Sequence, residues 1–118
     1  AGGGTAVVST IAGADPDDLR RDPVIADRAA DAAAALLAEA HERGLRCRGL
    51  VASGGHMASR LVDALGAQRL AVEREVAPLC PRGTVAGGAW SGLSLITKGG
   101  LVGSDDTLRT LVDDLWKD

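Results

Sequence analysis

Two glycine pairs stand where an apolar run gives way to a helical pattern. Ser53-Gly54-Gly55 ends one such run and Lys98-Gly99-Gly100 ends another. Glycine allows positive φ and lets a ligand approach the backbone without a Cβ in the way. Because the N–H groups of a helix N-terminus carry partial positive charge, such a turn suits a phosphate. The residue types therefore predict phosphate binding by backbone amides.

The candidate binding residues are those of the two turns and the positions beside them. They are Ser53, Gly54, Gly55, His56, Met57, Lys98, Gly99, Gly100 and Gly103. Lys98 would add a full positive charge. Neither turn matches the P-loop or the dinucleotide G-x-G-x-x-G pattern. A tight structural connection therefore stays open as the alternative reading of each glycine pair.

No residue can be assigned a catalytic role from spacing. Ser53 lacks the G-x-S-x-G elbow of a hydrolase, and no second His or Cys stands at metal-ligand spacing from His56. His56 is either a ligand contact or a capping residue. Asp105 and Asp106 complement the dipole of a following helix.

The composition bounds the function classes. A chain of 118 residues forms one domain, and 46% hydrophobic with 25% charged residues is typical of a folded protein. The net charge of −3 argues against a nucleic-acid partner. No apolar stretch has the length of a membrane span and no leader opens the sequence. With Cys47 and Cys80 expected as reduced thiols, these features predict a cytoplasmic protein.

Alternation of apolar segments and turn residues predicts a layered α/β domain, with a mixed or parallel sheet flanked by helices. We expect strands at 5–11, 47–52, 69–76, 84–87 and 92–97, and helices at 22–43, 56–65 and from Ser104 or Asp105 to Leu115. A loop is expected between Pro78 and Pro81. If neighbouring strands present both glycine turns at one edge of the sheet, the turns form a single crevice there.

Three packing expectations follow from spacing. The first helix should bury the face formed by Ile25, Ala29, Ala32, Leu36 and Ala40. Trp116 should pack the last helix on to the sheet. Trp90 should be a core residue or the wall of a cleft.

Four segments in this order resemble the C-terminal nucleotide-binding domain of the four-carbon acid sugar kinases, once grouped as a domain of unknown function. They are Gly49-Leu-Val-Ala-Ser-Gly-Gly-His-Met-Ala58, Leu65-Gly-Ala67, Val72-Glu-Arg-Glu-Val-Ala-Pro78 and Leu95-Ile-Thr-Lys-Gly-Gly-Leu-Val-Gly103. The resemblance runs from about Leu50 to the C-terminus. It implies that residues 1–118 are a nucleotide-binding domain, incomplete at its N-terminus, from a two-domain kinase.

The resemblance also implies a function. In this family the C-terminal domain binds ATP, with Mg²⁺ as cofactor, and a separate N-terminal domain binds a sugar acid such as threonate or erythronate. The glycine turns would line the nucleotide site. The isolated chain would not phosphorylate anything, and a homo-oligomer is compatible with the sequence.

The chain departs from the family pattern after the first glycine pair. The family usually has an acidic residue and then Thr, whereas this chain has His56 and Met57. Val102 stands where the second turn usually has Phe. These departures motivate an alternative, a non-catalytic interaction module that keeps the fold without nucleotide binding. A stand-alone phosphate-ester enzyme ranks last because no nucleophile–base pair is present.

Overall fold

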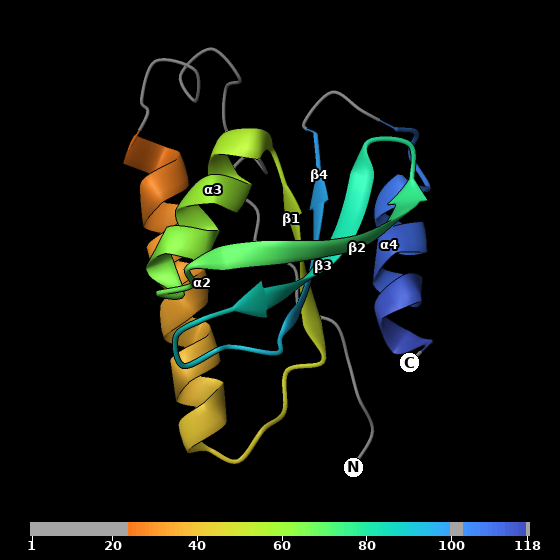
Figure 1. Ribbon diagram of the computed structural model, residues 1–118. Helices are drawn as coiled ribbons and strands as arrows, with labels where there is room; N and C mark the ends of the chain where they lie inside the picture. The colour runs from red at the N-terminus through yellow and green to blue at the C-terminus, as the bar shows by residue number, and fades with distance from the viewer. Residues whose placement is uncertain (1–23, 100–102, 118) are drawn as a thin grey trace.

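The computed structural model describes residues 24–99 and 103–117 (Figure 1). Its elements are α2 (Val24–Glu42), β1 (Gly49–Ser53), α3 (Gly55–Ala64), β2 (Arg69–Ala77), β3 (Cys80–Ala86), β4 (Ser94–Lys98) and α4 (Thr107–Trp116). The strand expected at 5–11 and the helix start expected at Asp22 lie outside the described residues.

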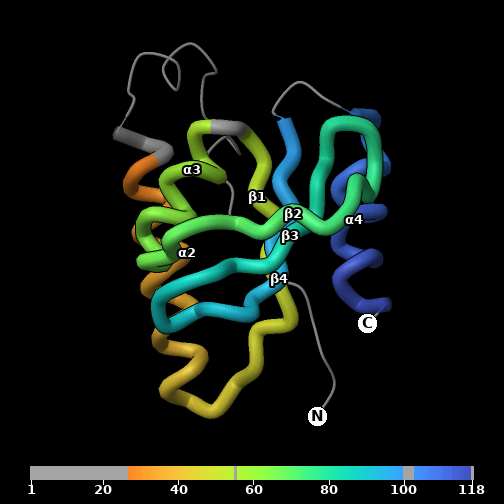
Figure 2. The backbone as a smooth tube through the Cα atoms, viewed as in Figure 1, coloured from red at the N-terminus to blue at the C-terminus, as the bar shows by residue number. Residues whose placement is uncertain are grey.

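The described strands form one mixed sheet in the order β1-β4-β3-β2. β1 and β4 are parallel, and β3 is antiparallel to both of its neighbours. Helices α2 and α3 cover one face of the sheet and α4 covers the other (Figures 1 and 2). The structure thus confirms the expected layered α/β architecture with partly parallel pairing.

Helix α2 packs mainly on α3, and its buried face matches the predicted one only in part. Ala29 is buried as predicted and Ala40 is partly buried. Ala30 and Leu37 join the core, whereas Leu36 is 54% exposed and Ala32 is exposed. The alanine run allows several helical faces of similar hydrophobicity, so the adjacent Leu36 and Leu37 could not be distinguished by spacing. Tertiary contact with α3 selects Leu37.

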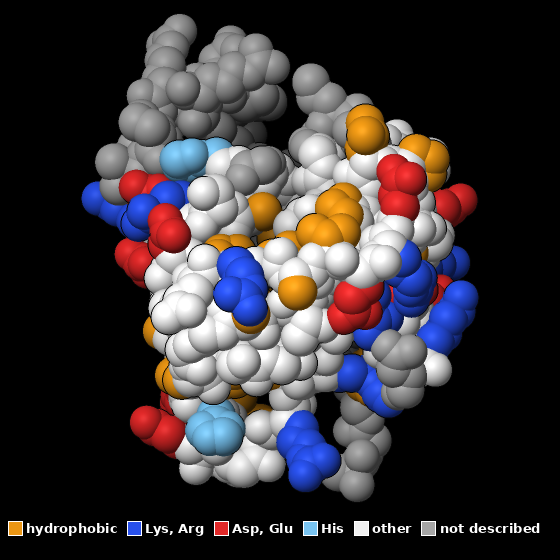
Figure 3. All heavy atoms as spheres, viewed as in Figure 1, with side chains coloured by type: hydrophobic (Ala, Val, Ile, Leu, Met, Phe, Trp, Pro, Cys, Tyr) orange, Lys and Arg blue, Asp and Glu red, His pale blue; other side chains and the backbone are white. Residues whose placement is uncertain are grey.

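A hairpin replaces the loop expected around Cys80. β2 and β3 pair as far as Ala77 and Cys80, which leaves only Pro78 and Leu79 in the turn. Leu79 has a φ of 62°, and its N–H donates to Glu75 Oε1 at 2.6 Å. β2 is one of the two edge strands of the described sheet, and its pairing with β3 has two register shifts. The space-filling view shows apolar and charged side chains mixed along this edge (Figure 3).

Helix α4 begins later than expected. Its first residue is Thr107 and its N-cap position is Asp106, without a side-chain capping bond, so the cap lies one or two residues after the predicted Ser104 or Asp105. Thr107 Oγ1 accepts the Ser104 N–H at 2.8 Å. Trp116 is 46% exposed, and the guanidinium carbon of Arg48 lies 5.0 Å from the centroid of the Trp116 ring. Trp116 therefore does not pack α4 on to the sheet as predicted. Leu111 and Leu115 do so instead.

Candidate functional site

The two glycine turns lie side by side. β1 and β4 run parallel in a register that pairs Ser53 with Lys98, so both strands end at the same level. The Gly54 N–H then donates to the Lys98 carbonyl oxygen at 2.7 Å, which continues the ladder into the turns. The expectation that both turns share the carboxyl edge of the sheet is confirmed.

The first turn leads directly into helix α3. Gly54 has a φ of 100°, a left-handed conformation that favours glycine, and its carbonyl accepts the Ala58 N–H at 3.0 Å. No side chain of Gly54 exists to cap the helix, so the N–H groups of the first turn are left to face the edge. These donors, with the positive end of the helix dipole, form an anion-binding arrangement.

The second turn adds an ammonium group. Lys98 is half-buried, and its Nζ donates to the Gly99 carbonyl at 2.9 Å. The side chain therefore folds over its own turn and stays at the edge of the sheet. Gly100 lies outside the described residues. Gly103 has a φ of 93° and leads into α4, whose N-terminus approaches this edge from the other face.

The side chains of His56 and Met57 are directed elsewhere. Met57 packs against the apolar core beneath α3. His56 Nε2 lies 3.3 Å from Asp27 Oδ1 on α2. Arg60 Nε lies 2.9 Å from the same oxygen, an ion-pair distance, although these two atoms are not aligned for a hydrogen bond. At these two positions after the first glycine turn, the groups left at the edge are therefore backbone amides.

Asp27 is a residue that the sequence did not mark. It stands in the first turn of α2, 29 positions before His56, where it complements the helix dipole. Only the packing of α2 on α3 brings it to His56 and Arg60. Its role is to tie the N-terminal half of α3 to α2 and so to fix the direction of the exposed amides.

The described residues contain no group of three or more His, Cys, Asp or Glu side chains that could hold a metal ion. A Mg²⁺ ion commonly binds through substrate phosphates with one or two carboxylates. The donor set at this edge therefore suits an ion that arrives with a polyphosphate, and does not suit a resident protein-only site. None of the described helices has the length and apolarity that crossing a membrane requires.

A hollow lies at the opposite end of the sheet, beside the amino ends of β1 and β4. It has a volume of about 290 Å³ and is lined by residues that include Trp90, His41 and Cys47. Trp90 is half-buried, lines this hollow and also packs against the apolar core, so both alternatives given for it hold in part.

Comparison with known proteins shows the family of this chain. Residues 2–108 match the family model of the nucleotide-binding C-terminal domain. The chain is 45% identical over 67 residues to a D-erythronate kinase of Heliobacterium modesticaldum, and 43% identical over 63 residues to a D-threonate kinase of Salmonella typhimurium. These matches cover 57% and 53% of this chain, and 15% of each kinase.

The fold also matches solved structures. Two crystal structures of a domain of unknown function from Bordetella bronchiseptica, both domain-swapped dimers with bound citrate, align with TM-scores of 0.69 and 0.70 at 33% identity. The first covers 93% of this chain and 25% of that protein, and the second covers 91% and 24%. With most of its length matched by the family model, this chain belongs to the nucleotide-binding C-terminal domain family of the four-carbon acid sugar kinases.

Proposed function

We propose that this chain binds ATP at the paired glycine turns and serves as the nucleotide domain of a cytoplasmic four-carbon acid sugar kinase. One observation supports this above all others: the Gly54 N–H bond to the Lys98 carbonyl, which holds both turns at one edge. The β- and γ-phosphates would lie across the two turns, within reach of the first amides of α3 and of the Lys98 ammonium.

Phosphoryl transfer depends mainly on positioning and on stabilisation of the phosphate charge. In this proposal the domain contributes both through rigid backbone donors and one cation. Mg²⁺ would neutralise part of the phosphate charge, and the exposed Asp105 and Asp106, the nearest acidic residues along the chain after the second turn, would help to hold it. The sugar acid, of the threonate or erythronate type, would be delivered by a separate domain.

A matched pair of glycine variants tests the proposal. Gly54 and Gly66 lie at the two ends of α3, with φ of 100° and 70°, and an added Cβ would meet nothing closer than 3.8 Å at Gly54 and nothing within 4 Å at Gly66. Both substitutions place a Cβ at positive φ, and Gly54→Ala should strain the backbone by more than about 1 kcal/mol because its ψ of 129° lies outside the left-handed helical region. Only Gly54→Ala should weaken the binding of ATP with Mg²⁺, by at least about tenfold in calorimetry.

Gly55→Leu should abolish binding in the same experiment because it places a large side chain at the first residue of α3. Failure of the unmodified protein to bind millimolar ATP would reject the proposal. Equal weakening by Gly54→Ala and Gly66→Ala would show that the loss follows from strain alone.

A second function is favoured by one observation. The position where the family pattern has an acid carries His56, whose ring pairs with Asp27 on α2. This contact fits a non-catalytic interaction module that has given up a polar contact with the nucleotide. Under this reading His56→Asp with Met57→Thr should produce a large gain in ATP affinity, whereas an active nucleotide domain should change little.

The isolated chain should show no kinase activity toward threonate or erythronate. The Bordetella relatives are domain-swapped dimers, so a homo-oligomer is part of the proposal. Sedimentation of this chain over a concentration series would measure it.

A further inference from the structure

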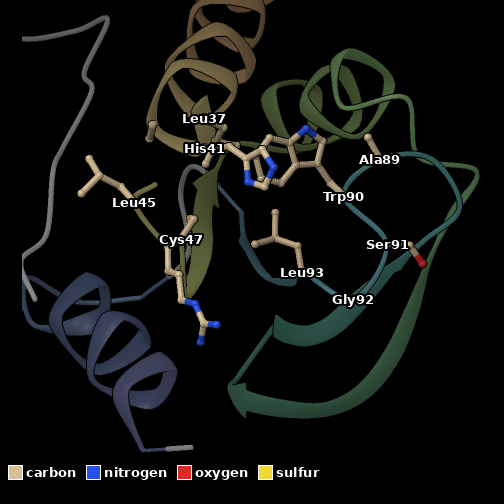
Figure 4. A pocket seen from close by; sticks show the side chains of 11 residues that line it. Leu37, His41, Leu45, Cys47, Ala89, Trp90, Ser91, Gly92 and Leu93 are labelled. Carbon is tan, nitrogen blue, oxygen red and sulfur yellow. The ribbon is translucent and has the colours of Figure 1, made fainter. Parts of the chain in front are cut away.

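The hollow at the amino ends of β1 and β4 is separate from the glycine turns (Figure 4). It lies between the C-terminal part of α2, the segment that leads into β1, and the connection from β3 to β4. The five-residue strands place the two ends roughly 15 Å apart. A ligand in the hollow would therefore be bound by different residues from one at the turns.

An aromatic pair forms one wall of the hollow. The ring centroids of Trp90 and His41 are 5.8 Å apart, and the ring planes meet at 72°. In Figure 4 the two side chains lie together above Leu93, with Cys47 across the opening. Leu93 and Leu37 are buried and supply an apolar floor. This combination suits a flat, apolar group that stacks on the indole.

The charged side chain among the described residues that line the hollow is a cation. Arg46 lines it and is exposed, and within the described part of the chain it makes no ion pair. None of the described residues that line the hollow carries a carboxylate. The nearby Arg43 is different, because its guanidinium pairs with Glu39 at 2.7 Å. Arg46 is therefore available to an anionic ligand, and Arg43 is already balanced.

We propose that this hollow binds a small planar carboxylic acid, with its ring against Trp90 and its carboxylate paired with Arg46. The volume of about 290 Å³ lies at the lower limit of small-molecule sites, which suits a single ring better than a nucleotide. A single arginine matches one carboxylate in charge and in its fork of donors. A triphosphate would require the additional backbone donors that the other end of the sheet offers.

The chain provides its own fluorescent reporter. Trp90 and Trp116 are its two tryptophans, and Trp116→Phe leaves Trp90 alone. In this background benzoate should change the fluorescence of Trp90 in a saturable manner at low-millimolar concentration. Benzamide, which has the same shape without the charge, should bind at least about tenfold more weakly.

Two arginine variants distinguish a direct ion pair between Arg46 and the carboxylate from a general effect of positive charge near the hollow. Arg46→Gln should remove the preference for benzoate over benzamide. Arg43→Gln removes the same charge three residues earlier in the chain and should leave that preference unchanged. A circular dichroism melt of each variant checks that the fold is kept.

Thiol labelling gives a second readout. Burial raises the pKa of the Cys47 thiol, which also donates to the Gly49 carbonyl at 3.5 Å, and Cys80 is fully buried. Iodoacetamide should therefore label Cys47 slowly and Cys80 hardly at all, and benzoate should slow the labelling of Cys47 further. Cys47→Ser identifies the labelled site.

Several results would overturn the proposal. These are a non-saturable fluorescence response, equal affinity for benzoate and benzamide, or an unchanged preference in Arg46→Gln. A response of Trp90 to ATP that Gly54→Ala abolishes would also overturn it, because the hollow would then be part of the nucleotide site. If ATP does not bind anywhere, the proposed function is contradicted. The proposal for the hollow is then still decided by the benzoate result.

Discussion

The two faces of the sheet are held to their helices by different forces. Under α2 and α3 the buried residues of the core cluster are all apolar: Ala30, Leu37, Ala52, Ala58, Leu61, Leu65, Val85, Leu93 and Leu95. Under α4 the cluster has four members, Cys80, Ile96, Leu111 and Leu115, and the buried charges Arg82 and Asp114 lie beside it. A single helix buries little apolar surface, and on this face ionic hydrogen bonds supplement the packing.

The buried charges form a directed network. Arg82 Nη1 donates to Asp114 Oδ2 at 2.7 Å and to the Asp114 carbonyl at 2.9 Å, and its Nη2 donates to Ser94 Oγ at 3.3 Å. The half-exposed Arg74 donates to the same carboxylate oxygen at 2.7 Å. Such contacts fix the rotation of α4 as well as its distance from the sheet. Acid should therefore destabilise the packing of α4 on its face of the sheet, and should not destabilise the face covered by α2 and α3.

The largest effect is expected on the α4 face. Asp114→Ala should lower the free energy of unfolding by about 3–5 kcal/mol because it leaves the buried Arg82 guanidinium without this counter-charge. Urea unfolding monitored by circular dichroism measures it. Asp113→Ala removes an exposed neighbour of the same charge and should cost less than about 0.5 kcal/mol. Similar costs for both variants would refute the distinction between the faces.

On the apolar face, Leu95→Ala should cost about 3 kcal/mol because Leu95 is fully buried and its loss creates a cavity. Leu36→Ala is the matched control, since Leu36 is mostly exposed. Thermal unfolding at neutral pH and at pH 4 should give the same cost for Leu95→Ala. A strong pH dependence of that cost would show that the two faces are not independent.

Gly83→Ala should lower the free energy of unfolding by about 1–3 kcal/mol through overpacking. An added Cβ would lie 2.7 Å from the backbone oxygen of Ala71 and 2.9 Å from Leu70 Cγ, so β2 would have to move. Ala86→Ser, a small change on the same strand, serves as control in the same denaturation series. A cost below about 0.5 kcal/mol would mean that the β2 edge shifts freely.

Acid should weaken the α4 face selectively. Burial alone would raise the pKa of the Asp114 carboxyl, but the hydrogen bonds and charges of Arg82 and Arg74 outweigh it and lower the pKa. The contribution to stability is therefore complete above the unfolded-state pKa of about 3.9 and is lost as pH falls toward the lower folded-state value. The effect should be smaller than that of Asp114→Ala, because protonation leaves the carboxyl atoms in place.

Comparison of unfolding curves from pH 7 to pH 3 for the unmodified chain and for Asp114→Asn isolates this group from the other carboxylates. The unmodified protein should show the steeper loss. Parallel curves would contradict the ionic attachment of α4.

The smallest effect is a gain. Leu79→Gly should stabilise the chain by up to about 1 kcal/mol because Leu79 holds a φ of 62° and is 68% exposed, so glycine relieves strain and removes little burial. The melting temperature measures this. A lower melting temperature would show that the Leu79 side chain stabilises the fold more than its exposure indicates. Pro78→Ala, at the neighbouring turn position, is the control.

The glycine turns were predictable because their signals are local. An apolar run, a glycine pair and a helical pattern follow one another within a few residues, and parallel strands end at the same edge. The buried face of α2 was predictable only in part, because alanines on every side leave the choice to the packing of α3. The Arg82–Asp114 pair was also hidden, since 32 positions separate two residues that are common on surfaces.

The functional contribution of His56 shows the same limit. Its position directly after Gly55 suggested either a ligand contact or a capping role, and the structure places its ring 3.3 Å from Asp27, a neighbour that the sequence did not indicate. Similarly, Leu79 gave no sign of positive φ, because glycine is the residue that usually marks this conformation. Sequence patterns identify which backbone is exposed, and tertiary contacts decide where each side chain goes.

The hydrogen bond from Gly54 to Lys98 restricts how the chain can change in length. Because it extends the pairing of β1 with β4, deleting one residue from either strand would slide one turn past the other by about 3.3 Å and reverse which side chains face each helix layer. Insertions between Gly87 and Gly92 would leave that alignment intact. Relatives should therefore vary in the connection from β3 to β4 and keep the lengths of β1 and β4.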